Sequence, residues 1–479
     1  MAAASTTASG AAFPTSARSV PADGCARGSG SAVTRRTVAR ASPGAPTLSR
    51  HMAPSVLRRR FATAAGLYLS VALGILGTIA AARMLGLEGF GLFATVTALV
   101  GLAQTLLDLT VEESLTKFGF RYVAGQEWGR LRRLFRQALL LKLAGGFVAT
   151  ILLIAFAPLA DELFDAEHIE AAILAAALLP LVQASENVGA TALLLHSRYD
   201  LRSVYQAGSM VLRLLAIVIG VQFGVDEALL AIVVAQLIST LVISVVGAVA
   251  LRKFPAASPE ELAEDVPEIR SFVVQSSVAT GVISLRSTLV PMLLGIVSGT
   301  TQVAFFRIAQ TPQTGLAAAS SPARLMLMTE QTRDWERGER TRILTGIRAY
   351  SKWAGALMVV AVPIFFIAMP WLVRIVFGSE YDDAVTAARV VLIAAAVQFL
   401  MGWTKTLPVT IGRPRLRIVT HGLETLVAIP LVVVLGAEWG ATGAAVAVLV
   451  STLVFGLAWL VVVLRLHDEV SAAEVSLQP

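Results

Sequence analysis

The chain has 479 residues, of which 56% are hydrophobic and only 15% are charged, and its mean hydropathy is +0.73. A soluble protein carries roughly 25% charged residues, so this composition excludes an ordinary soluble domain and favours a helical membrane protein. The formal net charge is +7. Because basic residues gather in the cytoplasmic loops of membrane proteins, this charge does not require nucleic acid, and no nucleic-acid partner is expected.

Residues 1–60 differ from the rest, since they are rich in Ala, Ser, Thr, Gly and Pro and carry many Arg. They cannot bury a core and are predicted to form a disordered basic tail. Three interpretations stay open: a cytoplasmic tail, a start assigned too early with Met52 as the true first residue, or a targeting peptide. The single cysteine, Cys25, excludes an intrachain disulfide.

Apolar segments of about twenty residues recur after this tail, and each can cross a hydrocarbon core of ~30 Å as a helix. The sequence predicts an all-α polytopic membrane protein with twelve transmembrane helices. The predicted spans are 61–84, 90–110, 138–159, 170–193, 205–221, 230–251, 271–296, 304–322, 353–375, 385–407, 419–434 and 443–463.

Charge in the connections predicts the orientation of these spans. Alternate connections hold eleven Asp or Glu and no Lys or Arg, whereas the remaining connections and both tails hold 31 of the 39 basic residues. These alternate connections, which together hold the eleven acids, are 85–89, 160–169, 222–229, 297–303, 376–384 and 435–442. The positive-inside rule therefore places both termini of a multi-pass membrane protein in the cytoplasm.

Segment 127–137, EWGRLRRLFRQ, has the pattern of a basic amphipathic helix. Such a helix can lie on the inner membrane surface and bind anionic lipids. An ordinary positively charged loop explains the same residues equally well.

The two halves of the chain resemble each other. LLHSRYDLRSV (194–204) aligns with VTIGRPRLRIV (409–419), and AQLISTLV (235–242) aligns with AVLVSTLV (447–454). Six spans is an even number, so the halves share one orientation. This predicts two six-helix lobes with pseudo-two-fold symmetry about the membrane normal, and alternating access between them. The predicted parts are an N-lobe (61–252), a cytoplasmic linker (253–270), a C-lobe (271–465) and a cytoplasmic C-terminal tail (466–479).

Basic residues outnumber acidic ones inside the predicted spans. A cation at the bilayer centre costs roughly 2.5–3.5 kcal/mol on insertion scales. Because the acids are too few to pair with all the cations, we expect an anion or water to share their space. The cations are Arg83, Lys142, Arg213, Arg286, Arg307, Arg374, Arg389 and Lys405, and the acids are Asp108, Glu170, Glu186 and Glu424.

Arg286 is the strongest candidate for binding an anion, because it lies near the middle of span 271–296 and cannot easily reach an interface. Pro291 follows it and can kink the helix. The alternative is a structural ion pair with Asp108 or Glu186. The guanidinium group suits phosphate because it donates two parallel hydrogen bonds.

Further cations are candidates for the same cavity. Arg213 and Arg307 lie in the bodies of their spans, and Arg307 is followed by a polar, proline-containing break at 310–314. Arg83 and Arg389 lie nearer the outer ends and Lys405 nearer the inner half, so snorkelling towards the interface is the simpler explanation for these three.

The acids allow two interpretations. Asp108 and Glu186 could bind a coupling ion, or they could balance the charge of a neighbouring Arg, which is the simpler alternative. His421 and Glu424 are three residues apart, on one helix face, and are interpreted as an interfacial pair. No catalytic constellation, metal-ligand spacing or cofactor motif is present, so no enzymatic activity and no cofactor are expected.

The segment 81–143 carries a pattern that joins two helices, A-R-x-L-G-x-x-x-F-G-x-(F/Y), through Ala82, Arg83, Leu85, Gly86, Phe90, Gly91 and Phe93. In this it resembles the bacterial polysaccharide biosynthesis flippases, within the multidrug/oligosaccharidyl-lipid/polysaccharide exporter superfamily. The likeness extends over about residues 60–465. The second-half counterpart, 292–310, departs from the pattern, so it assigns no role to Arg307.

The resemblance implies two lobes around a cationic cavity and translocation of polyprenyl-diphosphate-linked oligosaccharide to the outer leaflet. Polysaccharide polymerases or glycosyltransferases of the same pathway are implied partners. A lipid-II-type flippase is a close alternative. A cation-coupled multidrug exporter of the same fold should have an acidic cavity, which the basic excess opposes. A membrane glycan polymerase usually needs a larger outer loop or a catalytic acid in a loop, and the short outer connections of this chain oppose it. A non-transporting scaffold is the last alternative.

Overall fold

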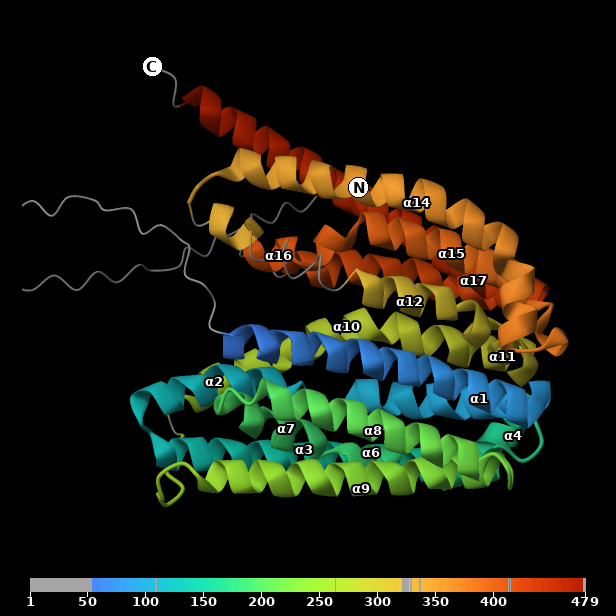
Figure 1. Ribbon diagram of the computed structural model, residues 1–479, viewed down its shortest axis with the longest axis horizontal. Helices are drawn as coiled ribbons and strands as arrows, with labels where there is room; N and C mark the ends of the chain where they lie inside the picture. The colour runs from blue at the N-terminus through green and yellow to red at the C-terminus, as the bar shows by residue number, and fades with distance from the viewer. Residues whose placement is uncertain are drawn as a thin grey trace, which may run out of the picture. The chain divides into compact units, whose positions relative to one another are not determined.

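The computed structural model describes residues 54–476, apart from 108–109, 263, 321–326, 328–329, 336, 412 and 414. All regular elements of the described residues are helices (Figure 1). The longer ones are α1 (Pro54–Leu107), α2 (Val111–Gly125), α3 (Trp128–Phe156), α8 (Tyr199–Gly220), α9 (Val225–Arg252), α10 (Val266–Ser298), α14 (Arg340–Val376), α15 (Ala384–Leu400) and α17 (Arg415–Ser476). The shorter ones are η1 (Ala157–Leu159), α4 (Ala160–Phe164), α5 (Ile169–Ala176), α6 (Leu179–Gln183), α7 (Glu186–Leu195), α11 (Thr300–Ala309), α12 (Thr311–Ala319), η2 (Ser379–Tyr381), η3 (Gly402–Lys405) and α16 (Leu407–Thr410).

Within the described residues, eight helical segments are long and apolar enough to cross a membrane. Large apolar side chains stand exposed along them, as on α14, where Val359, Ile367 and Trp371 are each more than half exposed. Water disfavours such a surface, whereas lipid tails do not. The chain is therefore a multi-pass helical membrane protein.

Two of these eight segments contain a glycine whose backbone is not helical. Gly86 divides α1 (φ 67°, ψ −176°), and Gly440 divides α17 (φ 55°, ψ −133°). Only glycine adopts such angles without strain. Each glycine lies in a connection that the sequence predicts between two spans, 85–89 and 435–442.

Three predicted spans are interrupted. Segment 170–193 forms α5, α6 and α7, while 385–407 forms α15 and η3 and reaches the start of α16. Segment 304–322 is divided at Gln310, where α11 ends and α12 begins with Pro312 in its first turn. This is the polar break that the sequence predicts, and the proline explains it because it has no N–H to donate.

The basic segment 127–137 belongs to α3 and does not form a helix of its own. Its apolar side chains Leu131, Leu134 and Phe135 are buried against other helices. The segment is therefore helical from Trp128 onward and not a loop, and protein covers its apolar face. Its place on the inner membrane surface stays a prediction.

The core surrounds α1, which packs against α8, α10 and α11, while α17 packs against α10 and α15. Phe90, Phe306 and Tyr381 are fully buried in its main cluster. The Tyr381 hydroxyl donates a hydrogen bond of 2.8 Å to the Ala82 carbonyl, so η2 is tied to α1. These packed helices hold the polar side chains of α1, α10, α11 and α17 in fixed positions.

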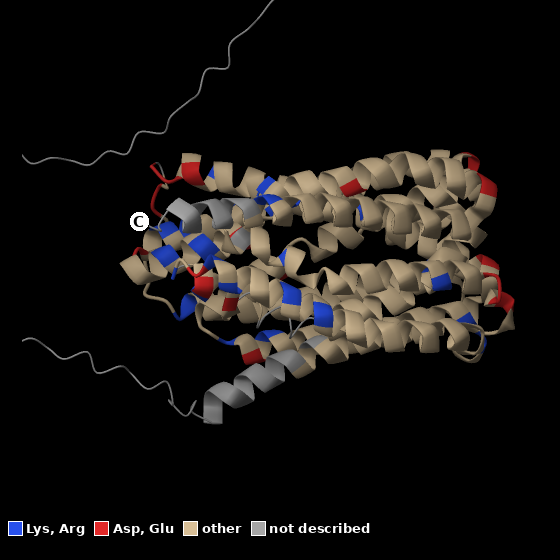
Figure 2. Cartoon of the chain, turned by 90° about the horizontal axis from the view of Figure 1, so that it is seen from above, with Lys and Arg blue, Asp and Glu red and all other residues tan. Residues whose placement is uncertain are grey.

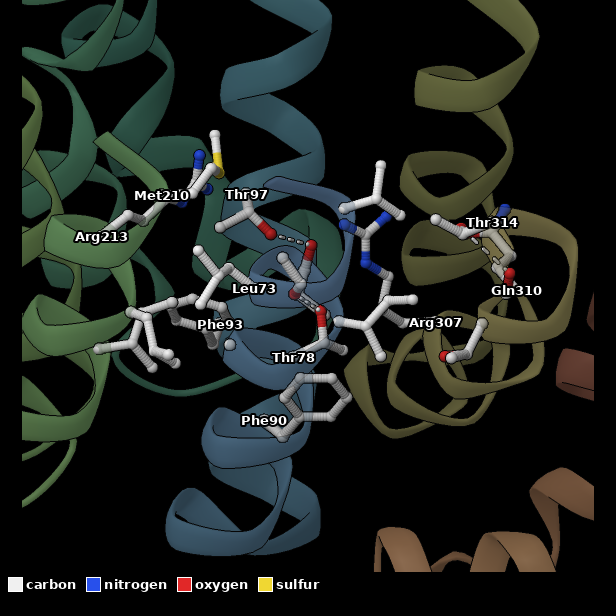
Figure 3. A pocket seen from close by; sticks show the side chains of 18 residues that line it. Leu73, Thr78, Phe90, Phe93, Thr97, Met210, Arg213, Arg307, Gln310 and Thr314 are labelled. Atoms are coloured by element: carbon white, nitrogen blue, oxygen red, sulfur yellow. Dashed lines mark hydrogen bonds between the residues drawn. The ribbon is translucent and has the colours of Figure 1, made fainter. Parts of the chain in front are cut away.

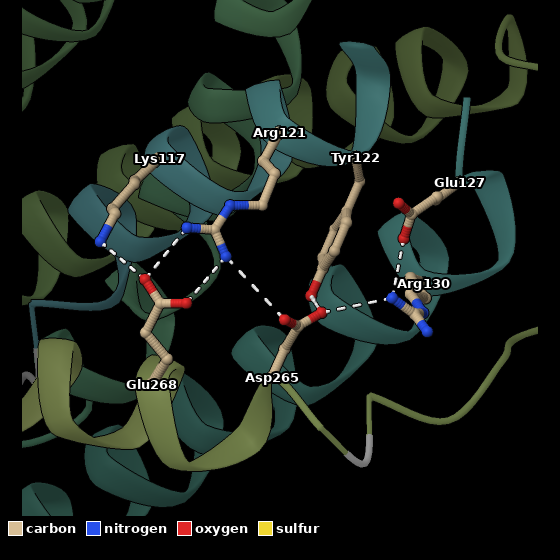
Figure 4. A network of polar contacts seen from close by, with 7 residues as sticks. All are labelled: Lys117, Arg121, Tyr122, Glu127, Arg130, Asp265 and Glu268. Atoms are coloured by element: carbon tan, nitrogen blue, oxygen red, sulfur yellow. Dashed lines mark hydrogen bonds and ion pairs between the residues drawn. The ribbon is translucent and has the colours of Figure 1, made fainter. Parts of the chain in front are cut away.

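Figure 4 shows a polar network that joins α2 and α3 to the start of α10. Glu268 pairs with Lys117 at 3.2 Å and with Arg121 at 2.8 Å. The Tyr122 hydroxyl donates to Asp265 at 2.8 Å, and Arg130 pairs with Asp265 at 3.5 Å. Burial and the hydrogen bond to Asp265 raise the pKa of the Tyr122 phenol. The phenol therefore stays a donor at neutral pH, and the network fixes the segment that precedes α10.

Charged side chains are not spread evenly over the described helices (Figure 2). Acidic residues outnumber Lys and Arg where α4 meets α5 and where α14 meets η2, whereas the opposite helix ends carry charges of both signs. This is the asymmetry that the loop charges predict.

Candidate functional site

A cavity of about 630 Å³ lies among α1, α10, α11, α12, α15, η3 and α17. Four cationic side chains line it, together with a single carboxylate and several amides. The charged and titratable lining residues are Arg286, Arg307, Lys405, Arg417, His421 and Glu424. We call this the central cavity.

Arg286 lies on α10 and faces α17 across the central cavity. Its Nη2 lies 3.4 Å from Glu424 Oε1, and its side chain is 17% exposed. The second oxygen of Glu424 lies 3.0 Å from His421 Nδ1. The sequence names Asp108 or Glu186 as a structural partner for Arg286. The observed partner is Glu424, because α17 and not α7 packs against α10.

Arg417, His421 and Glu424 occupy one face of α17, because intervals of four and three residues both fit the 3.6-residue turn. The Nε atom of Arg417 is buried and has no hydrogen-bond partner among the described residues. Sequence reasoning missed Arg417, which it assigned to a cytoplasmic connection. Its spacing from His421 and Glu424 is the signal that could have found it.

Arg307 lies in the last turn of α11, between fully buried neighbours, yet its own side chain is exposed. The exposure is explained by the cavity, which this side chain lines. Among the described residues, Arg307 makes no hydrogen bond and no ion pair. The break at Gln310 ends α11 directly after Arg307, which leaves this guanidinium at a junction of two short helices.

A second cavity of about 320 Å³ lies beside α1 and α8 (Figure 3). Arg213 of α8 and Arg307 of α11 both line it, and α1 passes between them in the figure. The two cavities share Val71, Arg307, Gln310 and Thr314. Arg213 also lines a smaller cavity of about 150 Å³ with Gln104 and Gln183. We call the second cavity the side cavity.

Amide side chains line the central cavity between its cations. Gln313 of α12 donates to Gln398 of α15 at 2.9 Å, and Gln398 donates to Thr452 at 3.2 Å. Gln310 lies between the two helices of the broken segment. Amides and hydroxyls of this kind can hydrogen-bond sugar hydroxyls or water.

Arg83 and Arg389 line none of the cavities described above. The Arg83 guanidinium donates to the backbone carbonyls of Val376, at 2.8 Å, and of Ile375 at the end of α14. Arg389 donates to the Phe366 carbonyl at 3.0 Å and lies 4.7 Å over the Phe366 ring. The structure thus brings Arg286, Arg307, Arg213 and Lys405 to two adjoining cavities, and it places Arg83 and Arg389 elsewhere. Substrate binding by these last two stays a prediction.

Two further deep charges have partners of their own. Glu186, on α7, accepts a hydrogen bond of 2.7 Å from Gln236. Lys142 is buried and pairs with Glu112 of α2 at 3.1 Å. Asp108, the other candidate for ion coupling or charge balance, lies outside the described residues, as does Met52.

The fold of this chain is similar to that of several solved membrane transporters. An inward-facing multidrug resistance MATE family transporter of the MOP superfamily has a TM-score of 0.67, with 16% identity over 83% of this chain and 96% of that one. The lipid II flippase MurJ has a TM-score of 0.65, with 12% identity over 85% of this chain and 87% of that one. A MOP superfamily transporter from Pyrococcus furiosus has a TM-score of 0.57, with 13% identity over 86% of this chain and 95% of that one. That transporter is described by a binding pocket of reverse polarity.

The family profile described as "Polysaccharide biosynthesis protein" matches residues 56–321, which is more than half of the chain. The chain belongs to this family. No curated protein sequence matches it.

Proposed function

We propose that this protein is a flippase that moves polyprenyl-diphosphate-linked oligosaccharide from the cytoplasmic to the outer leaflet. The observation that supports this most strongly is the charge of the central cavity, where four cations face one carboxylate that is already engaged. A cavity with this charge attracts anions and repels the organic cations that a multidrug exporter would carry. Membership of the polysaccharide biosynthesis family supports the same substrate class.

The chemistry of the cavity fits the two polar parts of such a substrate. Guanidinium groups of Arg286, Arg307 and Arg417 can hold the diphosphate through paired hydrogen bonds, with Lys405 as a point charge. Arg213 extends the basic surface into the side cavity. The amides of Gln310, Gln313 and Gln398 can hydrogen-bond sugar hydroxyls, while the polyprenyl tail stays among the lipids.

Movement of the head group follows from two lobes that rock around the cavity. In this proposal the N-lobe (61–252) and the C-lobe (271–465) each contain six spans, and the linker 253–270 joins them. Gly86 and Gly440 mark connections within the lobes at which one long helical segment becomes two spans. We place the protein in the bacterial plasma membrane with both termini in the cytoplasm, on the strength of the loop charges.

Translocation in proteoliposomes tests the proposal. We expect wild type to move a polyprenyl-diphosphate-linked glycan, Arg286→Ala to lose most of this activity, and Arg286→Lys to keep part of it because the charge remains. Normal membrane insertion of both variants is the control. Full activity in Arg286→Ala would remove Arg286 from the site, and failure of wild type to move the lipid would contradict the function itself.

A further inference from the structure

Glu424 is the only carboxylate among the described residues that line the central cavity. Its side chain is 5% exposed, and both of its oxygens are engaged, one with Arg286 at 3.4 Å and the other with His421 at 3.0 Å. A buried charge of this kind is costly unless it is paired. Glu424 therefore gives Arg286 a counter-charge that belongs to the protein itself.

Two other cations of the site, Arg307 and Arg417, differ from Arg286 in this respect. Arg307 makes no ion pair with the described part of the chain, and the Arg417 Nε has no hydrogen-bond partner there. A phosphate that enters the cavity therefore meets two different environments. It meets Arg307 and Arg417 without a competing carboxylate, but at Arg286 it must compete with Glu424.

We infer that Glu424 is a resident counter-anion, which the diphosphate of the substrate displaces from Arg286 and which returns to Arg286 when the substrate leaves. The inference rests on the proposed function and adds a residue that regulates affinity and release at the same site. It concerns phosphate-bearing anions as a chemical class, whether the phosphate belongs to a lipid head group or to a free ion.

The surroundings of Glu424 allow this exchange because the carboxylate keeps one partner after Arg286 turns to phosphate. His421 is three residues away on the same face of α17, and Phe455 stacks on its ring at 4.8 Å between centroids. The phenyl ring covers a face of the imidazole and leaves the Nδ1 edge to Glu424. A carboxylate with one remaining partner avoids most of the penalty of an isolated buried charge.

Competition has a defined consequence for affinity and rate. Phosphate must break the ion pair of Glu424 with Arg286 before it can use Arg286 fully, so the wild-type affinity is lower than the four cations alone would give. The same carboxylate speeds release, because it offers Arg286 a partner as the phosphate departs. Removal of its charge should therefore tighten binding and slow turnover together.

Binding measurements in nanodiscs test the inference with two probes, farnesyl diphosphate and inorganic pyrophosphate. We expect Glu424→Gln to bind farnesyl diphosphate about tenfold more tightly than wild type, the effect of one lost competing charge pair. Its translocation rate at saturating substrate should fall. If Glu424→Gln binds both probes more tightly, the site recognises the phosphate groups alone. If it binds only farnesyl diphosphate more tightly, the site recognises the lipid-linked form. The matched control is Glu438→Gln, an exposed residue of the same helix that lines no described cavity.

The double variant Arg286→Ala/Glu424→Gln separates competition from a general change in charge. If Glu424 acts through Arg286, the double variant should bind no more tightly than Arg286→Ala alone. Glu424→Asp keeps the charge but shortens the side chain, so we expect its affinity to lie between those of wild type and Glu424→Gln. If Glu424→Gln does not fold, the affinity of Glu424→Asp tests the competition instead. Wild-type affinity in both single Glu424 variants would overturn the inference while leaving the flippase intact. Absence of diphosphate binding by wild type would overturn both.

Discussion

At the residue scale, the distinction that matters is between cations that face a cavity and cations that face protein. Depth in the membrane identified Arg286, Arg213 and Arg307 from the sequence, because a deep cation is costly without an anion or water nearby. Depth also set Arg83 and Arg389 apart as nearer the span ends, but it could not show that their guanidinium groups bind backbone carbonyls of α14. It also missed Arg417, because hydropathy assigns that residue to a connection although α17 carries it into the cavity.

Arg307 provides a direct test of the cavity at this scale. It lines both the central and the side cavity and has no protein partner in the described part of the chain. We expect Arg307→Ala to slow lipid translocation by about tenfold or more, the value of one charge-assisted contact. Arg307→Lys should recover part of the loss.

Arg374→Ala is the matched control for this test. Arg374 is an exposed cation at the end of α14 that pairs with Asp382 and lines no described cavity. Its replacement should leave translocation close to wild type. Equal rates for wild type and Arg307→Ala would show that the cavity does not use this side chain.

At the element scale, glycine and proline gave reliable signals, whereas the fine division of helices did not. The break at Gln310 follows from Pro312 and its polar neighbours, and the turn at 85–89 follows from its glycines. In 170–193, Pro180 lies near the first division and the polar residues 183 and 185–187 lie at the second, but these signals alone do not predict three separate helices. Tertiary contacts decide that division, because α5, α6 and α7 all pack on α9.

The backbone geometry at position 86 is predicted to require glycine for full stability. Its angles of φ 67° and ψ −176° lie where a side chain is strained, so Gly86→Ala should lower the free energy of unfolding by about 1–3 kcal/mol. Thermal unfolding in detergent measures the change. Gly355→Ala, a helical position of α14 with open space around an added Cβ, should be neutral or slightly stabilising.

The polar network of Figure 4 makes a second prediction at this scale. Asp265→Ala leaves the buried Tyr122 hydroxyl without its acceptor, so it should cost about 1–3 kcal/mol of stability. Glu268→Ala removes ion pairs that are half exposed, and exposed pairs contribute little because water and salt screen them. Thermal unfolding of the two variants should therefore show a larger loss of stability in Asp265→Ala than in Glu268→Ala. A larger loss of stability in Glu268→Ala would contradict the prediction.

At the scale of the whole molecule, composition was sufficient to predict a multi-pass helical membrane protein. The loop charges predict its orientation, since connections that contain Lys or Arg alternate with connections that contain none. Which cations converge on one cavity could not be predicted, because convergence depends on how α10, α11 and α17 pack, and apolar helices carry weak signals for their neighbours.

Cysteine labelling tests the orientation. In a Cys25→Ser background, Ser258→Cys lies in a predicted cytoplasmic connection and Ser379→Cys in a predicted outer one, and both serines are exposed. We expect a membrane-impermeant maleimide to label position 379 in intact cells and position 258 only after the membrane is opened. The reverse pattern would invert the proposed topology.

The central claim is that the basic cavity serves an anionic, lipid-linked substrate. The most direct measurement compares two cargoes in wild-type proteoliposomes, a polyprenyl-diphosphate-linked oligosaccharide and a lipophilic organic cation. The account predicts translocation of the lipid-linked sugar and no transport of the cation, because four cations face one engaged carboxylate in the central cavity. Export of the organic cation without movement of the lipid-linked sugar would contradict it.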